Sequence, residues 1–380
     1  MKVNIFMPKY MLDFKCINSK CTDTCCAGWD INIDEATYNK YINSDGIFKE
    51  LIDGKFVKNN NEHESFNHGF MILKDERRCP FLNSNMLCDI HGELGEENLC
   101  ITCKSYPRVF NLIDNIYEKS GLSSCEEICI RAFLNKDKME FIELEEELEE
   151  DNIEIRRIID SEAFEGTESI LQYFWDIRVI SINIMQLREF SIEERLSILK
   201  NFYNQIEKAY NEYKFIEIEE ILENFNEESM NYNLLKGLAF NENNEFYIKI
   251  CDEDLIKSIR SLRLKQCVNE YREGILNKKN ICQYLTKESK YFNDLKEYDY
   301  IFENYIVNQI FKDLIPFNKG KSLIKSINVL INIYRLIKAY VIGISINSNK
   351  KITDKEIVRV IQALGKDMEH NKVFVSILEE

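Results

Sequence analysis

The sequence lacks several of the signals that identify secreted and membrane proteins. Residues 1–15 contain no continuous apolar stretch of the kind found in a secretory signal peptide. No window of about eighteen residues is both apolar and uncharged. The most apolar segment, 324–346, is interrupted by Lys325, Arg335 and Lys338. These absences predict a cytoplasmic protein without a membrane-spanning segment, in which 324–346 is a buried core helix.

A glycine-rich cofactor-binding loop is also absent. The chain has 13 glycines, but none of them form a G-x-G-x-x-G motif. The nearest candidate, His91–Gly95 (HGELG), has glycines at the wrong spacing and follows no clear strand. The usual doubly wound nucleotide-binding fold places such a loop directly after its first strand. We therefore expect any nucleotide-like cofactor of this protein to be held in another way.

Positive charge is scarce relative to negative charge. The chain has 49 basic and 65 acidic residues, which gives a net charge of -16. This balance disfavours nucleic acids and anionic membranes as partners, because both require a clustered positive surface. Much of the excess lies in residues 140–154 (EFIELEEELEEDNIE). We interpret residues 136–155 as an acidic linker or an exposed helix.

Cysteine, by contrast, is abundant and unevenly distributed. The chain has 13 cysteines, and most of them precede residue 130. Those in this first third are Cys16, Cys21, Cys25, Cys26, Cys79, Cys88, Cys100, Cys103, Cys125 and Cys129. In a reducing cytosol such thiols are more typical of metal sites or redox chemistry than of disulfides. The remaining Cys251, Cys267 and Cys282 lie on apolar helix faces and are expected to be inert.

The chain changes character near residue 135, which predicts a mainly α protein with two regions. Residues 1–135 show little apolar periodicity and are predicted to be a Cys-rich, metal-bound region with little regular structure. A brief strand is expected at 30–34, a helix at 35–42 and a strand around 70–73. Residues 156–380 show helical periodicity and are predicted to form a large helical domain.

Within the helical domain the pattern predicts individual helices. Ser191–Glu194 and Thr353–Glu356 are capping boxes, each of which predicts a helix directly after its first residue. Residues 241–251 are expected to form a short hairpin-like insert. The remaining helices are predicted within 161–189, 216–226, 252–277, 295–314 and 322–345.

Zinc and iron–sulfur clusters are the centres that soft thiolates select most readily. A structural zinc site usually contains two C-x2-4-C hooks. Cys21 with Cys25 or Cys26 forms one hook, Cys100 with Cys103 forms another, and two more thiols lie between them. Eight thiols suffice for two zinc ions, or for one cluster with thiols to spare. The C-x3-C-x2-C spacing of radical enzymes that use S-adenosylmethionine (SAM) is not met, because Gly28 stands at the third position.

Several motifs resemble the flagellin lysine N-methylases. The motif match covers about residues 8–130, and a weaker similarity appears at 303–317. The segment 21–31 also resembles small zinc- or iron-chelating domains with a CxxxCxxCC signature. The motifs are Cys21–Ile31 (CTDTCCAGWDI), Cys79–Leu82 (CPFL), Leu87–His91 (LCDIH), Leu99–Cys103 (LCITC), Tyr106–Arg108 (YPR) and Leu122–Cys125 (LSSC).

The resemblance implies a SAM-dependent protein-lysine N-methyltransferase that acts on flagellin and carries a cysteine-ligated [4Fe-4S] cluster. It does not say which thiols are the ligands, and it singles out no catalytic residue. The competing hypothesis is a zinc-binding structural or interaction protein without catalysis. The oligomeric state is left open. The candidate cluster ligands are Cys16, Cys21, Cys25, Cys26, Cys79, Cys88, Cys100 and Cys103, with Cys125 as a further candidate.

Four residues near the thiols are candidates for binding SAM. Trp29 and Tyr106 are suited to stack on the adenine or on the sulfonium. Asp34 is suited to bind the ribose or to orient an amine, and Arg108 to hold a carboxylate through a bidentate pair. The alternative for each of them is structural, with Trp29 in a core, Asp34 as a helix cap and Arg108 in an ion pair.

Overall fold

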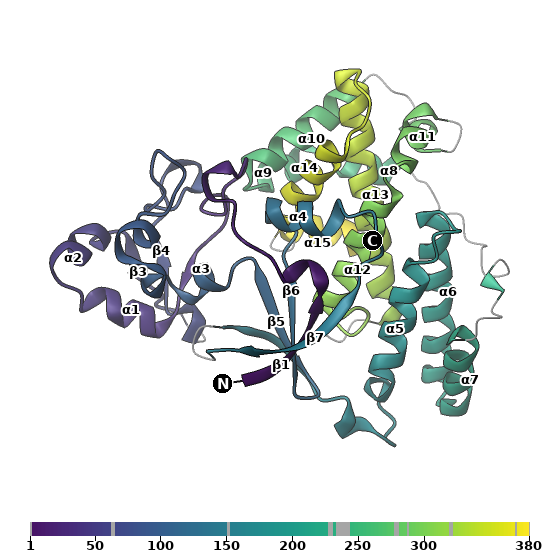
Figure 1. Ribbon diagram of the computed structural model, residues 1–380. Helices are drawn as coiled ribbons and strands as arrows, with labels where there is room; N and C mark the ends of the chain where they lie inside the picture. The colour runs from purple at the N-terminus through teal and green to yellow at the C-terminus, as the bar shows by residue number, and fades with distance from the viewer. Residues whose placement is uncertain are drawn as a thin grey trace.

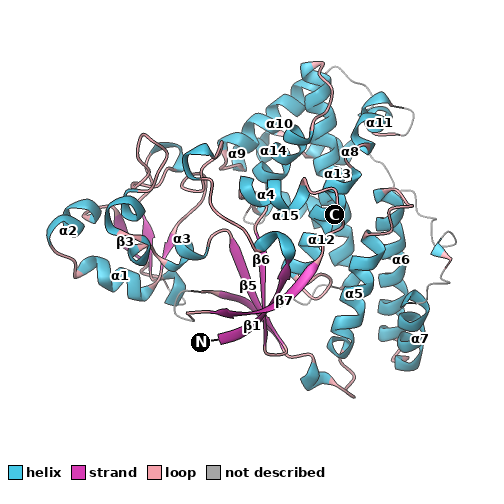
Figure 2. Cartoon of the chain, in the orientation of Figure 1, coloured by secondary structure: helices cyan, strands magenta, loops and turns pink. Residues whose placement is uncertain are grey.

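The computed structural model is mainly α, as the sequence predicts, and combines helices with two small sheets (Figures 1 and 2). It describes residues 2–61, 65–149, 153–226, 231–232, 244–276, 281–286, 289–318, 322–368 and 371–379. The helices gather on one side of the molecule, and a smaller lobe projects on the other side. The larger sheet lies between them.

A five-stranded sheet is built from segments on both sides of the small lobe in sequence. Its strand order is β7-β1-β6-β5-β8. β1 runs parallel to β6 and antiparallel to β7, and β5 runs parallel to β8. β5 and β6 form a tight hairpin whose turn residues Asp114 and Asn115 both have positive φ. The bounds are β1 Lys2–Pro8, β5 Arg108–Ile113, β6 Ile116–Gly121, β7 Phe141–Glu147 and β8 Ile155–Ile159.

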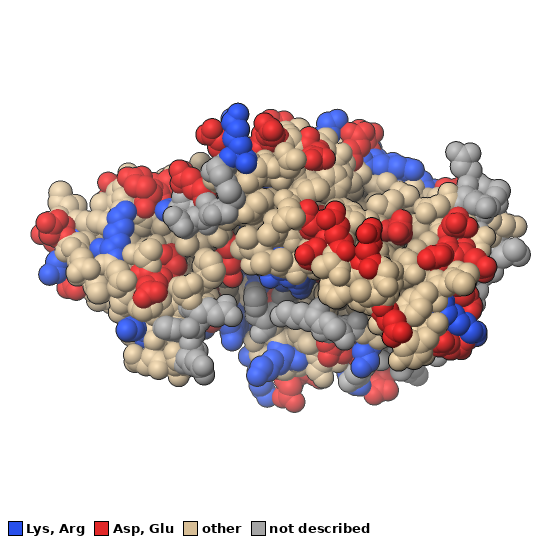
Figure 3. Space-filling view, turned by 90° about the horizontal axis from the view of Figure 1, so that it is seen from below, with Lys and Arg blue, Asp and Glu red and all other residues tan. Residues whose placement is uncertain are grey.

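The prediction of an acidic linker or exposed helix at 136–155 is wrong, because this run contains the edge strand β7. Along β7 the exposed positions are Glu143, Glu145 and Glu147, whereas the residues between them are partly buried. This alternation has the period of a strand, but most of the alternating residues are glutamates, so the charge concealed the pattern. Acidic side chains are also prominent over much of the face shown in Figure 3.

The small lobe, residues 30–106, is held by short elements. Its three-stranded sheet has the order β2-β4-β3, with β2 Asn32–Ile33, β3 Phe56–Lys58 and β4 Gly69–Met71. Its helices are α1 Glu35–Ile42, α2 Gly46–Ile52 and α3 Ile101–Ser105. The predicted helix at 35–42 is confirmed, with Asp34 as its N-cap. The strands expected near 30–34 and 70–73 are confirmed as β2 and β4.

The helical domain matches most of the predicted helices. The Ser191–Glu194 capping box is present, and the Thr353 side chain caps the helix that follows it. The predicted helix at 252–277 is two helices, separated at Ile259–Ser261. The hairpin-like insert is wrong within 244–249, which is helical, while 241–243 lie outside the described residues. The helices are α4 Glu126–Phe133, α5 Phe174–Met185, α6 Ile192–Asn211, α7 Phe215–Asn226, α8 Asn244–Lys249, α9 Glu253–Ser258, α10 Leu262–Ile275, α11 Lys290–Lys296, α12 Asp299–Asp313, α13 Leu323–Ser348, α14 Asp354–Gly365 and α15 Lys372–Glu379.

Helix α13 lies at the centre of the helical domain and packs against α6, α10 and α15. Within the described part of the chain it is the one helix whose length and composition would allow it to cross a membrane. Of its most apolar window, 83% is buried inside the molecule. The prediction of a buried core helix at 324–346 is therefore confirmed.

The apolar core divides at the small lobe and not at residue 135. One continuous core includes Ile5 and Met7 of β1, Phe110 of β5 and the inner faces of the helices as far as Leu378. The small lobe has a separate core, formed by buried residues between Ile31 and Cys100. The large sheet thus belongs with the helical domain, and the small lobe is inserted between its strands β1 and β5.

Candidate metal and cofactor site

Five cysteines share the core of the small lobe. Cys79 and Cys100 are buried there, and Cys26, Cys88 and Cys103 are half-buried against the same core. We refer to these five residues as the inner thiol set. They come from three motifs and from the loop that enters the lobe, so sequence motifs as far apart as CTDTCC and LCITC meet in one place.

Backbone hydrogen bonds explain how the inner set is brought together. The Cys79 amide donates to the Cys26 carbonyl at 2.8 Å, which places the CPFL segment beside the CTDTCC loop. Leu82 and Cys88 form an isolated β-bridge. Cys100 precedes α3, and the Cys103 amide donates to the Cys100 carbonyl at 2.9 Å. The result is a tight hook that presents both thiols from one turn.

The thiols of the inner set influence one another electrostatically. Burial, with smaller contributions from the nearby Cys26, Cys88 and Cys100, raises the pKa of Cys79 to about 12. A hydrogen bond between Cys100 and Cys103 lowers the pKa of Cys100 and raises that of Cys103. Burial also raises the pKa of Cys88. Cys79, Cys88 and Cys103 therefore stay protonated at neutral pH unless a cation displaces their protons.

A second group, the outer thiol set, comprises Cys16, Cys21, Cys25 and Cys125. Burial raises the pKa of Cys21 and of Cys125 to about 11. Electrostatic interaction with Cys16 raises the pKa of Cys125 and of Cys25. Interaction with Cys125 raises the pKa of Cys21 and of Cys25. None of the four belongs to the core of the small lobe. Cys16 is exposed and the other three are half-buried, so this set is more accessible than the inner one.

The adjacent residues Cys25 and Cys26 connect the two sets. A hydrogen bond between their side chains raises the pKa of Cys25 and lowers that of Cys26 to about 7. The outer thiols Cys16 and Cys125 raise the pKa of Cys25. Cys26, in contrast, raises the pKa of the inner thiols Cys79, Cys88 and Cys103. The two cysteines of the CC pair therefore belong to different sets.

Both sets have the donor chemistry of a thiolate metal site. Soft thiolates favour zinc and iron–sulfur centres, and each set offers at least four of them. Among the residues that the structure describes, no three His, Cys, Asp or Glu side chains are already arranged as a metal-binding group. Binding therefore requires side-chain rotations that bring the sulfur atoms of a set together.

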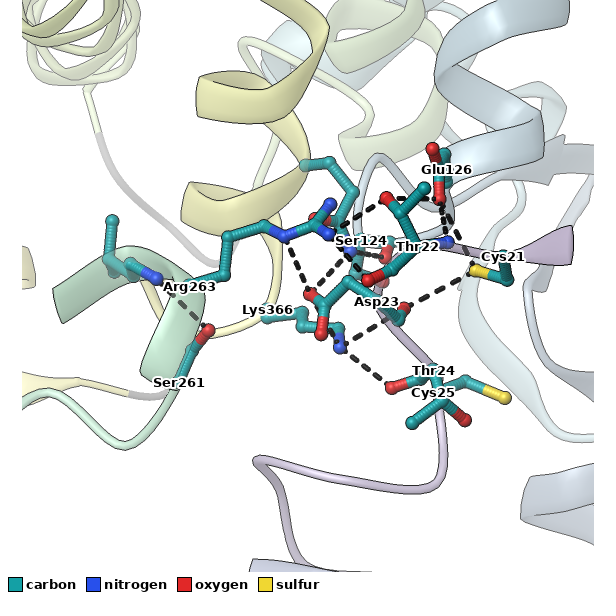
Figure 4. A network of polar contacts seen from close by, with 12 residues as sticks. Cys21, Thr22, Asp23, Thr24, Cys25, Ser124, Glu126, Ser261, Arg263 and Lys366 are labelled. Atoms are coloured by element: carbon teal, nitrogen blue, oxygen red, sulfur yellow. Dashed lines mark hydrogen bonds and ion pairs between the residues drawn. The ribbon is translucent and has the colours of Figure 1, made fainter. Parts of the chain in front are cut away.

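The CTDTCC loop is fastened to the end of helix α14 (Figure 4). The Lys366 ammonium lies 2.8 Å from the Asp23 carboxylate and also donates to the Thr24 carbonyl at 2.8 Å. Gln362 donates to the same carboxylate at 3.1 Å. The Lys366 side chain is only 4% exposed. This shielded ion pair holds the segment between Cys21 and Cys25 against the helical domain.

Two further side chains fix the start of the same loop. The Glu126 carboxylate accepts hydrogen bonds from the Thr22 amide at 2.6 Å and from its hydroxyl at 2.9 Å, and it contacts the Cys21 sulfur at 3.5 Å. Arg263 of α10 donates to the Thr22 carbonyl at 2.6 Å. Cys21 and Cys25 of the outer thiol set therefore lie at the junction of the loop, α4 and the helices α10 and α14 (Figure 4).

Trp29 and Tyr106, two of the predicted SAM-binding residues, lie side by side next to the outer set. Their ring centroids are 5.5 Å apart. The Trp29 indole donates to the Cys25 carbonyl at 2.5 Å, and the Tyr106 and Ser124 hydroxyls are 3.1 Å apart. Burial raises the pKa of Tyr106, with Cys125 and Cys25 contributing. The aromatic pair and the outer thiols thus share one environment.

The other two predicted residues lie in different surroundings. Both oxygens of Asp34 accept backbone hydrogen bonds, from Thr37 in α1 and from Ile101 in α3, so it caps two helices of the small lobe. Arg108 lies over the ring of Phe14, 5.2 Å from its centroid. Within the described residues no ion pair is formed by Arg108.

The glycine that interrupts the radical-enzyme spacing has a conformational reason. Gly28 has a φ of +94°, a backbone conformation that residues with a side chain rarely adopt. A Cβ at this position would lie 3.8 Å from the Cα of Ser261, which is an ordinary contact. The backbone, and not lack of space, therefore excludes a third cysteine here.

The sequence did not reveal which residues of the helical domain hold the CTDTCC loop in place. Arg263, Gln362 and Lys366 lie in ordinary amphipathic helices or at their ends, and no motif marks them. For Glu126, the one sequence signal was its position directly after Cys125, the last residue of the LSSC motif. Cys129 donates to the Ser123 carbonyl at 2.9 Å and belongs to the main core. Cys251 and Cys267 are also buried.

Comparison with known proteins gives the family. The model of the FliB lysine N-methylase C-terminal domain matches residues 178–380. This match covers more than half of the chain. The chain belongs to the FliB lysine N-methylase family. The matched segment begins within α5 of this FliB-family protein, so it comprises α10 and α14, which hold the CTDTCC loop, but not Glu126 or the two thiol sets.

Individual relatives agree with this family. The chain is 30% identical over 142 residues to the flagellar biosynthetic protein FliU of Salmonella muenchen, which covers 36% of this chain and 82% of FliU. It has the same identity over the same length to the lysine-N-methylases of Salmonella choleraesuis and Salmonella typhimurium. The matched region spans only 34% of each of these two enzymes. No solved structure is significantly similar to the chain.

Proposed function

We propose that this protein is a SAM-dependent protein-lysine N-methyltransferase that acts on flagellin and uses a thiolate-bound [4Fe-4S] cluster. Its family membership supports lysine methylation, and the name of its relative FliU supports a flagellar substrate. The cofactor part of the proposal depends on one observation. The aromatic pair Trp29 and Tyr106 lies against the more accessible of the two thiol sets.

The outer set fits the cluster better than the inner set. Its candidates Cys16, Cys21, Cys25 and Cys125 are exposed or half-buried, and Cys21 and Cys25 lie where the loop meets the helical domain. When bound, a cluster with one iron free of a protein thiolate offers a coordination position to the amino and carboxylate groups of SAM. The remaining requirements of the reaction fall on the side chains around this set.

Trp29 and Tyr106 would orient the adenine or the sulfonium of SAM. A cationic sulfonium is attracted to the face of an aromatic ring. The two rings are held by hydrogen bonds at their polar ends, from the Trp29 indole to the Cys25 carbonyl and between the hydroxyls of Tyr106 and Ser124. Because these contacts fix the rings before SAM binds, little conformational entropy is lost on binding.

Arg108 would bind the carboxylate of SAM. Its guanidinium is half-buried, and its one recorded side-chain contact is the Phe14 ring. A guanidinium donates a strong, charge-assisted hydrogen bond to a carboxylate, here to the oxygen that the iron would leave free, which fixes orientation as well as adding affinity. Asp34 does not belong to this proposed pocket, because both of its oxygens already cap helices.

The acceptor lysine must reach the site as a neutral amine and in a place shielded from water. The net charge of -16 favours the approach of lysine-bearing protein surfaces over nucleic acids and anionic membranes. A cytoplasmic location would bring the enzyme into contact with flagellin before export. These statements about partners and location are part of the proposal.

The decisive experiment has two readouts. Protein purified without oxygen should be brown and contain iron and sulfide. Flagellin co-expressed with it should gain methyl groups on lysine, detected by peptide mass spectrometry. The double variant C16A/C125A should lose the colour and the methylation, whereas C267A, which removes a buried thiol of the helical domain, should keep both. A colourless wild-type protein that contains only zinc and leaves flagellin unmodified would refute the proposal.

A further inference from the structure

The large sheet ends at β8 in an exposed aliphatic side chain. β8 is the last strand of the order β7-β1-β6-β5-β8, so no other strand of the described residues pairs with its outer side. Native edge strands are commonly blocked by charges, prolines or bulges. The opposite edge strand, β7, exposes three glutamates, whereas β8 exposes Ile158, which is 68% exposed. The register irregularity of β8 lies at its start, and residues 157–159 pair regularly with β5.

An apolar row crosses the whole sheet and stops at this edge. The registers of β7, β1, β6, β5 and β8 place five residues opposite one another, namely Leu144, Ile5, Tyr117, Leu112 and Ile158. Residues paired in this way lie on the same face of a sheet. Ile5 is buried and Tyr117 is 7% exposed, whereas Leu112 is half-buried. A sixth strand beside β8 would continue the row and cover Ile158.

The same edge starts close to the candidate SAM site. β5 begins at Arg108 and runs parallel to β8, with Phe110 opposite Ile155. The start of β8 therefore lies about 7 Å along the strand direction from the level of Arg108. Because side chains alternate along a strand, Arg108 and Leu112 lie on the face that carries Ile158. A segment that paired with β8 and continued beyond Ile155 would run toward the proposed methyl donor.

The charges at this edge indicate what kind of strand fits it. Arg156 lies 3.0 Å from the Asp313 carboxylate, and Arg157 donates to the Asp313 carbonyl. The Lys312 ammonium lies 2.7 Å from the same carboxylate. Three basic side chains thus gather around one aspartate where α12 ends beside β8. Like charges would meet if β8 paired with β8 of a second copy, whereas a strand that carries carboxylates is complementary.

We propose that β8 is the docking edge for the protein substrate, and that an extended segment of flagellin adds a sixth strand to the large sheet there. Main-chain hydrogen bonds would supply affinity, and side chains at alternate positions would supply specificity. The segment carries an aliphatic or aromatic side chain beside Ile158, carboxylates near the arginines, and its acceptor lysine beyond the Ile155 end. The inference deepens the proposed function and rests on it for the identity of the substrate.

The variant I158E tests the docking edge in the full-length protein. Because Ile158 is largely exposed, the variant should fold and keep the thermal unfolding midpoint of the wild type. Its affinity for monomeric flagellin, measured by biolayer interferometry, should fall about tenfold or more, because a carboxylate replaces an apolar contact and repels the acidic segment. In methylation assays the KM for flagellin should rise while kcat is kept. I216E, the same substitution at a 74% exposed position of α7, is the matched control and should behave as the wild type.

Hydrogen–deuterium exchange tests whether the backbone of β8 takes part in binding. Addition of flagellin to the wild type should slow the exchange of amides within residues 155–159. Amides of the opposite edge strand, residues 141–147, should exchange as before. The same addition to I158E, at a flagellin concentration that saturates only the wild type, should give little protection at 155–159.

Three outcomes would overturn the inference. The first is a wild type that does not bind flagellin, or an I158E variant that binds and methylates it equally well. The second is flagellin binding that leaves the exchange of 155–159 unchanged. The third is a wild-type dimer, seen by sedimentation, that I158E converts to monomers without loss of flagellin binding, since β8 would then join two copies. Binding with protection of β8 but without methylation would instead refute the proposed function and leave the docking edge standing.

Discussion

Lys366 and Asp23, which lie 343 residues apart in the chain, form a shielded ion pair in which the ammonium and the carboxylate are 2.8 Å apart. The pair connects the end of α14 to the loop that carries Cys21, Cys25 and Cys26. The helical domain, which carries the family match, thereby determines the conformation of a cysteine loop that lies outside that match.

The substitution K366M should loosen this loop. It leaves the Asp23 carboxylate with Gln362 and the more distant Arg263, at 3.8 Å, as its partners and removes the hydrogen bond to the Thr24 carbonyl. Because Asp23 is partly solvated, we expect a loss of about 1–3 kcal/mol in the free energy of unfolding, measured by urea denaturation. The outer thiols should also be alkylated faster. K372M, which alters an exposed lysine in α15, is the control, and equal behaviour of the two variants would contradict this role for Lys366.

Restoring the radical-enzyme spacing with G28C should destabilise the protein. The φ of +94° at Gly28 disfavours any side chain, so G28A and G28C should each cost about 1–2 kcal/mol. The measurement is the midpoint of thermal unfolding. G92A is the control, because a Cβ at Gly92 meets open space and its φ is not positive. If G28A were as stable as the wild type, the backbone explanation for the missing third cysteine would fail.

The ion pair between Arg178 and Glu118 joins α5 to the large sheet. The two side chains are 2% and 0% exposed and form two hydrogen bonds, of 2.6 and 2.8 Å. Loss of one partner leaves the other charge buried, so R178M should destabilise the protein by about 3–5 kcal/mol. The double variant R178M/E118L should recover a large part of this loss.

The exposed pair Lys351 and Glu297 provides the control for that experiment. Its side chains are 59% and 61% exposed. K351M should therefore change the free energy of unfolding by less than about 1 kcal/mol. Equal effects of K351M and R178M in urea denaturation would show that burial does not decide the strength of these pairs.

Asp299 should make the stability depend on pH. Burial, together with the nearby Glu193, raises the pKa of this carboxyl to about 7. A raised carboxyl pKa favours the folded state at low pH, so this contribution is fully present near pH 4 and is lost as the pH rises through 7. D299N should flatten the pH dependence of unfolding in this range. D254N, at a site with a 90% exposed side chain, should leave it unchanged.

The sequence predicted those parts of the molecule that depend on local patterns. The helix at 35–42, the Ser191 capping box and the buried helix α13 follow from periodicity and caps, which act within a few residues. The large sheet was missed because its strands are short and are separated by the small lobe, so their pairing depends on tertiary structure. Its edge strand β7 was also hidden by its charge.

For the candidate site, the sequence identified the thiols but not their partition. Spacing alone could not assign Cys25 and Cys26 to different sets, because that assignment depends on which distant segments approach each of them. Lys366 carried no signal, since a lysine near the end of an amphipathic helix is ordinary. Asp34 illustrates the opposite case. The sequence suggested either a cofactor-binding role or a helix cap, and the contacts of Asp34 are those of a helix cap.

Strand β7 has a consequence for the behaviour of the protein in solution. As an edge strand it has one side that is not paired within the five-stranded sheet, and such edges tend to pair with those of other molecules. Its exposed Glu143, Glu145 and Glu147 place like charges along this edge. Two copies that approached edge to edge would therefore repel each other, so the acidic run protects the protein against aggregation through its sheet.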